Sequence, residues 1–216
     1  MLNACALTIV RNGDDYLRPV IDRIAPFVSS VRIWVDSRSD DDTWYIARTL
    51  AQKYKNVAVK HFYVSTPLFD LVDMRNDQLT FREPWGFIVD SDELHHDIEK
   101  YHFGNESAYS FMSWSPWDME RGHKASQRAI IGRVFRNVGK LEWRGLFGKE
   151  ILYRGEKKVF DEATLLPYRY IHFTHLKKDT WRAELNQQRV ADDRALSPLP
   201  PDIINIIKNV NELQTV

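Results

Sequence analysis

The sequence predicts an α/β fold built on a mixed, mostly parallel sheet that is flanked by helices. In the first half of the 216-residue chain, short apolar runs alternate with segments of helical periodicity, which is typical of parallel strands joined by crossover helices. The second half holds strand-like segments with few helices between them, which predicts antiparallel additions to the sheet. Two helical patterns end the chain. A chain of this length is expected to form a single domain.

The first half is expected to contain four strands and three helices. The strands are the apolar runs 4–10, 31–35, 57–64 and 85–89, and the helices lie near 17–24, 46–51 and 71–79. Pro19 indicates that the first helix either begins near that residue or is kinked there. An aspartate from the polar run 36–42 is expected to cap the second helix. Ligands of such sheets bind beyond the carboxyl ends of the strands, so we expect the functional site there.

The second half is expected to add strands at 108–114, 129–136 and 141–143. Two helices are expected to finish the chain. One covers about 180–194, and the other carries a stripe of apolar residues between 203 and 213. We expect that stripe to pack against the body of the protein or a partner subunit.

The composition excludes several classes of protein. The chain has 30 basic and 30 acidic residues, and a net charge of zero argues against a protein that coats nucleic acid or an anionic membrane. The single cysteine, Cys5, excludes an intrachain disulfide and a multi-cysteine zinc site, and it suits a reducing compartment. The apolar runs are too short for a membrane span and no basic leader is present, so we expect a cytoplasmic protein. Nothing in the sequence indicates the oligomeric state.

Asp90 and Asp92 follow the apolar run 85–89 and are separated by one residue. Their carboxylates can therefore point to one side and share a hard divalent cation, which takes oxygen ligands and often diphosphate oxygens. Carboxylates where a buried strand emerges are costly unless they are paired or metal-bound. The pair predicts a metal-diphosphate site, with a solvated turn or a helix cap as the alternative.

Four motifs occur in a characteristic order, followed by three weaker segments. The motifs are Ala-Leu-Thr-Ile-Val-Arg-Asn at 6–12, Ile-Trp-Val-Asp-Ser-Arg-Ser-Asp-Asp-Asp-Thr at 33–43, Met-Arg-Asn at 74–76 and Trp-Gly-Phe-Ile-Val-Asp-Ser-Asp-Glu at 85–93; the segments are 133–136, 143–150 and 170–172. This succession resembles glycosyltransferase family 2, over about the first 95 residues. The resemblance implies the GT-A fold, a DXD motif and a nucleotide-diphosphate sugar donor. It also implies a donor-binding half at 1–95, an acceptor-side half at 96–178 and C-terminal helices at 179–216.

Two departures from the family pattern are visible. The usual Gly-Ser-Thr-Asp-Gly-Thr stretch is Arg-Ser-Asp-Asp-Asp-Thr at 38–43, and the frequent His-Glu pair is Lys149-Glu150. The first change affects the loop expected to contact the donor, and the second removes an imidazole.

The resemblance assigns the donor site residue by residue. Asn12 and Asp36 would bind the nucleotide sugar, with Asp36 on the base or ribose, and Arg75 would contact the base or the diphosphate. Asp90 would contact the ribose or a water on the metal, and Asp92 would bind the metal, which is Mn²⁺ or Mg²⁺. An arginine facing the crevice suits anionic oxygens.

His172 is the favoured additional ligand of the metal or the diphosphate, with His175 as a competitor. Neutral imidazole binds Mn²⁺ and imidazolium binds phosphate. The alternative is a structural histidine. The residues His95, His96 and His102 lack the four-residue spacing of hydrolytic zinc sites.

The acceptor side is expected to lie in the second half. Trp117 follows Pro116 in an expected loop, where its ring can stack on an acceptor sugar. Glu150 is the first candidate for the catalytic base and Asp118 the second, with Glu120 as a further carboxylate in this half.

We therefore expect a metal-dependent, inverting glycosyltransferase that moves a sugar from a nucleotide-diphosphate donor to a hydroxyl of a glycan or other acceptor. One alternative is a sugar-phosphate nucleotidyltransferase, which normally carries a glycine-rich basic loop where this chain has only Arg11-Asn12-Gly13. Another is a non-catalytic module of the same fold that binds a nucleotide sugar or a glycan.

Overall fold

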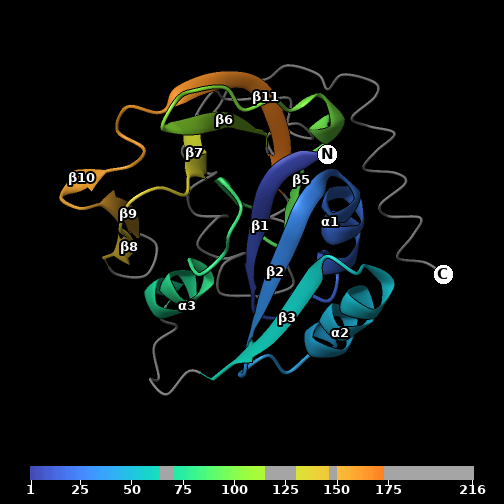
Figure 1. Cartoon of the computed structure of the whole chain (residues 1–216). Helices are drawn as coiled ribbons and strands as arrows, with labels where there is room; N and C mark the ends of the chain where they lie inside the picture. Colours follow the sequence, from blue (N-terminus) through green and yellow to red (C-terminus); the bar gives the residue numbers. More distant parts are fainter. Residues whose placement is uncertain (64–70, 115–129, 146–149, 173–216) are drawn as a thin grey trace, which may run out of the picture.

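The protein is described by a computed structural model over residues 1–63, 71–114, 130–145 and 150–172 (Figure 1). Within these ranges an eight-stranded sheet of order β3-β2-β1-β4-β7-β6-β11-β5 forms the body, and a three-stranded sheet of order β10-β9-β8 lies beside it. This arrangement confirms the predicted α/β fold with a mixed, mostly parallel sheet.

Four parallel strands form the first half of the large sheet. They are β3 (Val57–Phe62), β2 (Val28–Asp36), β1 (Leu2–Val10) and β4 (Trp85–Ile88), and each neighbouring pair is parallel. From Ala4 to Val10 every residue of β1 is buried. A strand covered on both faces needs apolar side chains on both, which explains the continuous apolar run.

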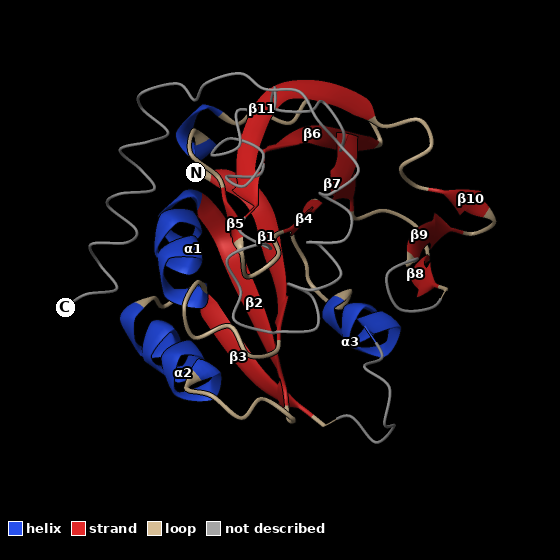
Figure 2. Cartoon of the chain, turned by 180° about the vertical axis from the view of Figure 1, so that it is seen from behind, coloured by secondary structure: helices blue, strands red, loops and turns tan. Residues whose placement is uncertain are grey.

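Helices cover both faces of this parallel half (Figure 2). On one face, α1 (Leu17–Ile24) and α2 (Thr43–Lys53) pack over Ala4 and Ala6 of β1. On the other, α3 (Leu71–Gln78) packs Met74 against Ile9. The alternation of β1 side chains between these two clusters follows from the period of two in a strand. Two short 3-10 helices, η1 (Ala25–Phe27) and η2 (Ile98–Lys100), complete the helical elements of the described residues.

The first residues of α1 and α2 show where Pro19 lies and which aspartate binds the start of the second helix. Helix α1 begins at Leu17, so Pro19 lies in the first turn, where its missing N–H costs no hydrogen bond. Asp42 is the N-cap residue of α2, but its side chain makes no capping hydrogen bond. Instead Asp41 Oδ1 accepts the N–H of Thr43 at 3.0 Å. An aspartate of the run 36–42 thus binds the first N–H of the helix, as expected, and that aspartate is Asp41.

The second half of the large sheet curls back onto the first. Strand β7 (Ile130–Arg136) pairs antiparallel with β4 and with β6 (Ala108–Trp114), and β6 runs parallel to β11 (Thr164–His172). The last strand, β5 (Glu93–Leu94), is antiparallel to β11, yet it follows β4 after residues 89–92 alone. The last strand of this order, β5, therefore lies directly after β4, a strand from the middle of the sheet, and the turn between them joins the two. In Figure 1, β11 and β6 arch over this region.

The small sheet consists of β8 (Leu141–Arg144), β9 (Ile151–Arg154) and β10 (Lys157–Lys158). The strand expected at 141–143 is present, but it lies in this second sheet beside α3 and not in the large one. The expected helices at 180–194 and 203–213 fall outside the described residues. None of the described helices combines the length and the apolar character needed to cross a bilayer.

Candidate functional site

The loops that leave β1 and β2 are tied together by hydrogen bonds. Asn12, in the left-handed region with φ 48°, donates its N–H to Ser39 Oγ at 3.3 Å and accepts the N–H of Asp40 on its Oδ1 at 3.1 Å. Gly13 donates its N–H to Thr43 Oγ1 at 2.7 Å. The structure thus gives Asn12 a positioning role for the loop that ends β2; its contact with a donor stays a prediction.

The same β1 loop lies against the turn after β4. A Cβ on Gly13 would lie 2.4 Å from Val10 Cγ2, which is too close without a shift, and 3.5 Å from Ser91 Oγ, which is ordinary van der Waals contact, so Gly13 lies next to the turn after β4. The carboxyl ends of β1, β2 and β4 consequently converge, as expected for a parallel sheet of this kind.

Asp36 is fully buried at the end of β2, and Arg38 engages its carboxylate. Arg38 donates its backbone N–H (2.9 Å) and Nε (3.1 Å) to Oδ1 and its Nη2 (2.8 Å) to Oδ2. These hydrogen bonds raise the pKa of the Arg38 guanidinium. Arg38 occupies one of the positions where the chain departs from the family pattern. A group of the nucleotide sugar that binds the Asp36 carboxylate must therefore share it with Arg38 or displace Arg38.

The acidic turn, residues 90–93, connects β4 to β5. Glu93 is fully buried, Asp92 is 3% exposed and the Asp90 side chain is 32% exposed. The turn closes on itself, because Glu93 N–H donates to the Asp90 carbonyl at 3.0 Å and Asp90 N–H donates to Glu93 Oε2 at 3.1 Å. Only Asp90 of the three carboxylates is substantially open to solvent.

Two guanidinium groups flank Asp90. Arg75 Nη2 of α3 lies 3.5 Å from Asp90 Oδ1, and Arg133 Nη2 of β7 lies 3.4 Å from Oδ2. Burial tends to raise the pKa of Asp90, but Arg133 and Arg75 outweigh it, and the pKa is lowered. Asp90 is therefore ionised near neutral pH and faces cations on both oxygens.

Asp92 faces His172 at the end of β11. His172 Nε2 lies 3.4 Å from Asp92 Oδ2. Burial lowers the pKa of the imidazole, but the interaction with Asp92 outweighs this effect and the pKa is raised. The structure thus places His172 beside the acidic pair, whereas His175 lies outside the described residues.

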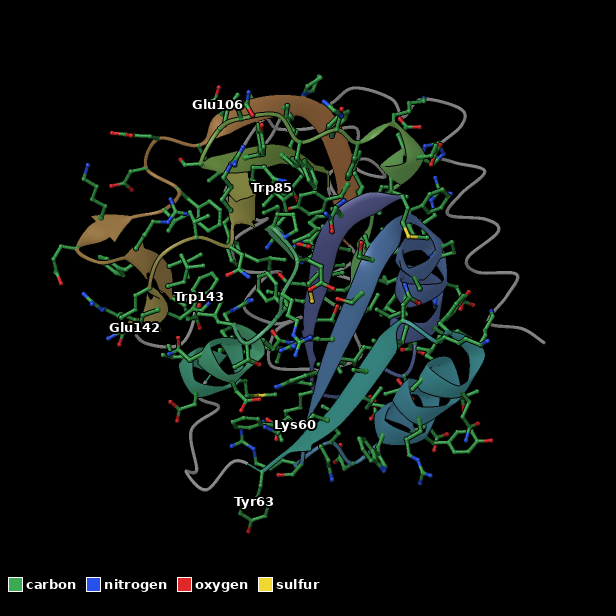
Figure 3. The ribbon with its side chains drawn as sticks, in the orientation of Figure 1. Lys60, Tyr63, Trp85, Glu106, Glu142 and Trp143 are labelled. Atoms are coloured by element: carbon green, nitrogen blue, oxygen red, sulfur yellow. The ribbon has the colours of Figure 1, made fainter. Side chains whose placement is uncertain are left out.

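Arg75 is held by a second contact that sequence reasoning missed. Its guanidinium carbon lies 5.0 Å from the centre of the Trp143 ring on β8, in a cation–π arrangement. Asn76 fixes this strand, because its Nδ2 donates to the Trp143 carbonyl at 3.0 Å and its Oδ1 accepts the Trp143 N–H at 2.7 Å. Figure 3 shows Trp143 directly beside α3. The adjacent residues Arg75 and Asn76 thus join the acidic turn to the second sheet.

Sequence reasoning also missed the buried pair of Glu93 and Arg133. Arg133 Nη2 donates to Glu93 Oε1, and Arg133 Nε donates to Tyr170 Oη at 3.2 Å. Burial raises the pKa of Glu93 to about 7, although Arg133 opposes this rise. An arginine within the otherwise apolar run of β7 was the available signal, because a buried charge requires a partner.

The acidic turn and His172 offer side-chain atoms that could bind a divalent cation. Asp92 and His172 offer a carboxylate oxygen and an imidazole nitrogen, a combination that first-row divalent cations accept. Among the residues that the structure describes, no group of three or more His, Cys, Asp or Glu side chains gathers into a metal site. Asp92 and His172 alone could therefore bind a cation that takes its remaining ligands from a diphosphate and water.

The acceptor-side candidates are placed only in part. Glu150 is partly buried and directly precedes β9. Trp117, Asp118 and Glu120 lie outside the described residues, as does Lys149. The catalytic base and the acceptor platform stay predictions.

No protein-family model and no curated protein matches the chain. Solved structures do. The chain is similar to S. aureus TarS 1-349, with a TM-score of 0.50 and 12% identity over 81% of this chain and 61% of that one. It is also similar to the mannosyltransferase PcManGT from Pyrobaculum calidifontis in complex with GDP-Man and Mn²⁺, with a TM-score of 0.52 and 13% identity. This match covers 92% of this chain and 66% of that one. The chain spans less than two thirds of each structure. The chain therefore shares the fold of these two structures, in agreement with the expected GT-A fold.

Proposed function

We propose that the protein is a metal-dependent, inverting glycosyltransferase that moves a sugar from a nucleoside diphosphate to an acceptor hydroxyl. The observation that carries this proposal is the acidic turn at the converging strand ends, where Asp92 faces His172 and two arginines face Asp90. The GT-A fold supports it, since its ligands bind at this edge of the sheet.

The donor's diphosphate is assigned to the space beside Arg75, the acidic turn and His172. Arg75 is 12% exposed, and its guanidinium is oriented by Trp143 and Asp90, so it can meet phosphate oxygens without a large loss of side-chain entropy. Asp92 and His172 would hold the cation, Mn²⁺ or Mg²⁺. When bound, that cation stabilises the negative charge of the leaving diphosphate. The complex of PcManGT with GDP-Man and Mn²⁺ supports a nucleotide-sugar donor and a divalent cation, while the residues that hold them here are our proposal.

The remaining steps fall to the chain's own side chains. Asp90 stays ionised between two guanidiniums and accepts hydrogen bonds from the ribose or from water. Asp36 contributes to the nucleotide side of the crevice. An inverting transfer takes place in one displacement, in which a carboxylate removes the proton of the attacking hydroxyl. Glu150 and Asp118 are the candidates for that carboxylate, and Trp117 is the candidate for stacking on the acceptor.

The test separates binding from turnover. Isothermal titration with UDP and GDP, each with and without Mn²⁺, should give binding that Mn²⁺ strengthens at least tenfold. A screen of nucleotide sugars should then give Mn²⁺-dependent release of the nucleoside diphosphate. Binding without release for any donor and acceptor would favour the non-catalytic module, and absence of both would reject the proposal.

A further inference from the structure

Arg133 is a buried cation at the centre of the curled sheet. It lies on β7, the antiparallel neighbour of β4, one residue before Val134, which pairs with Phe87. Its side chain is 7% exposed, and its guanidinium lies 5.1 Å over the Tyr170 ring of β11. The arginine thus reaches the acidic turn from one neighbouring strand while it rests on another.

Its contacts link both ends of the turn. Arg133 Nη2 donates to Glu93 Oε1, lies 3.4 Å from Asp90 Oδ2 and donates to Tyr170 Oη at 3.0 Å. Glu93 in turn accepts the backbone N–H of Asp90 on its other oxygen at 3.1 Å. The guanidinium, the Glu93 carboxylate and the Asp90 residue therefore form a closed ring of contacts.

The charges make this ring necessary. The turn carries three carboxylates within four residues, and one of them, Glu93, is fully buried. A buried carboxylate that loses its counter-ion is strongly destabilised and must take up a proton or move toward water. Protonation would weaken the hydrogen bond that Glu93 Oε2 accepts from the Asp90 N–H, and movement would break it. The loss of Arg133 would in addition release one side of the Asp90 carboxylate.

We propose that Arg133 is a positioning residue: through Glu93 it sets the backbone of the acidic turn and the direction of the Asp90 carboxylate, and thereby the place where the donor's diphosphate and its cation are received. This inference rests on the proposed function, and it adds a residue that does not itself touch the donor. Arg133 holds the turn, while Arg75, which is more exposed, meets the ligand.

The experiment compares Arg133→Met and Arg133→Lys with Arg136→Met. Arg136 lies on the same strand and donates to the carbonyls of Glu106 and Gly104 at 3.0 Å, so its loss also removes hydrogen bonds of a β7 arginine but none at the acidic turn. Two quantities are measured: amide hydrogen exchange at Asp90 and Glu93 relative to β1, and the affinity for UDP or GDP with Mn²⁺, whichever the wild type binds more tightly.

Arg133→Met should speed exchange at the two turn amides at least tenfold relative to β1 and weaken Mn²⁺-dependent nucleotide binding at least tenfold. Arg133→Lys keeps the charge without the fork of donors and should fall between wild type and Arg133→Met, and it decides the question alone if Arg133→Met does not fold. Arg136→Met should lower the melting temperature and leave both quantities unchanged.

Unchanged exchange at the turn in the Arg133 variants overturns the inference. Faster exchange with unchanged nucleotide affinity overturns it too, because Arg133 would then be structural only. A wild type that binds neither nucleotide rejects the proposed function instead, and the exchange data then decide by themselves whether Arg133 positions the turn.

Discussion

His172 Nε2 lies 3.4 Å from Asp92 Oδ2, although the two residues are 80 positions apart in the chain. The contact exists because β11 pairs with β5, in a register that puts His172 opposite Glu93. The curl of the sheet thus brings the end of its last long strand back to the turn that follows β4. A carboxylate and an imidazole in this arrangement can take a divalent cation or stabilise each other as an ion pair.

Asp92→Asn should reduce Mn²⁺-dependent nucleotide binding at least tenfold, which corresponds to about 1.4 kcal/mol. The amide keeps the shape of the side chain but loses the charge that attracts the cation. Isothermal titration in the presence and absence of Mn²⁺ measures the effect. Asp97→Asn serves as the control, since Asp97 pairs with Lys100 at 3.0 Å on the loop after β5. A folded Asp92→Asn protein with unchanged Mn²⁺-linked affinity contradicts the assignment.

Arg75→Met should weaken nucleoside diphosphate binding by about 1 to 3 kcal/mol, the range for a lost charge-assisted hydrogen bond. Trp143→Leu should weaken it by a smaller amount, because it removes the ring under the guanidinium but leaves the charge. Titration of both variants with the same nucleotide measures the two losses. Arg82→Met, a change at an exposed arginine after α3, should have no effect. Equal affinities for wild type and Arg75→Met would place the diphosphate elsewhere.

Asp36→Asn should weaken nucleotide binding by about 1 to 3 kcal/mol if the Asp36 carboxylate contacts the base or ribose. Arg38→Ser should weaken binding less, because it leaves that carboxylate in place and opens it to the ligand. Both variants should be less stable than wild type, since each breaks a partly buried ion pair. Titration with UDP and GDP compares them. A larger loss for Arg38→Ser would mean that the arginine, and not Asp36, meets the nucleotide.

Glu93 predicts a pH dependence of stability. Its pKa is raised from 4.5 to about 7 in the folded protein by burial, against the effect of Arg133. The folded state therefore binds a proton more tightly than the unfolded state, and the stability contributed by this proton is lost as pH rises from about 4.5 to about 7. Glu93→Gln should lack this loss, so its melting temperature relative to wild type should be higher at pH 8 than at pH 5.

Thermal unfolding at a series of pH values checks this prediction. Glu142→Gln on β8 changes a carboxylate that is 44% exposed and should keep the wild-type profile. Parallel profiles for wild type and Glu93→Gln would show that Glu93 does not titrate in this window.

The parallel half of the sheet could be predicted because its strands are buried on both faces. Such strands appear as continuous apolar runs, and β1 to β4 lie within about two or three residues of the expected bounds over the described ranges. The convergence of Asn12, Asp36 and Asp90 at one edge then follows from parallel topology alone.

The closure of the sheet could not be predicted in the same way. Strand β5 has two residues, which is too short for any periodicity. Strand β11 contains Pro167 and shifts register between Leu165 and Arg169, so its alternation is interrupted. The partners of the acidic turn that arise from long-range pairing, Arg133 and Glu93 above all, therefore became visible only in the structure. Arg38 was visible as a departure from a pattern, but its local contact with Asp36 was not.

The catalytic base is the last prediction. An inverting transfer needs a carboxylate on the acceptor side of the anomeric carbon, away from the cation. The carboxylates of the acidic turn are engaged by arginines and by His172, and the acceptor side is expected in the second half of the chain, so the base is predicted there. Glu150 is partly buried ahead of β9 and ranks first, and Asp118 ranks second because it follows the aromatic segment that contains Trp117.

Glu150→Gln and Asp118→Asn preserve shape but cannot accept a proton, so the true base should lose turnover by a factor on the order of 10² or more while donor affinity is preserved. Single-donor turnover and titration of the same preparations measure the two quantities. Glu142→Gln is the matched control, because Glu142 lies on the strand paired with β9 and its carboxylate is bound by Arg144 Nε at 3.0 Å. If Glu120→Gln slows transfer and neither Glu150→Gln nor Asp118→Asn does, the base lies at Glu120 and both first choices are wrong.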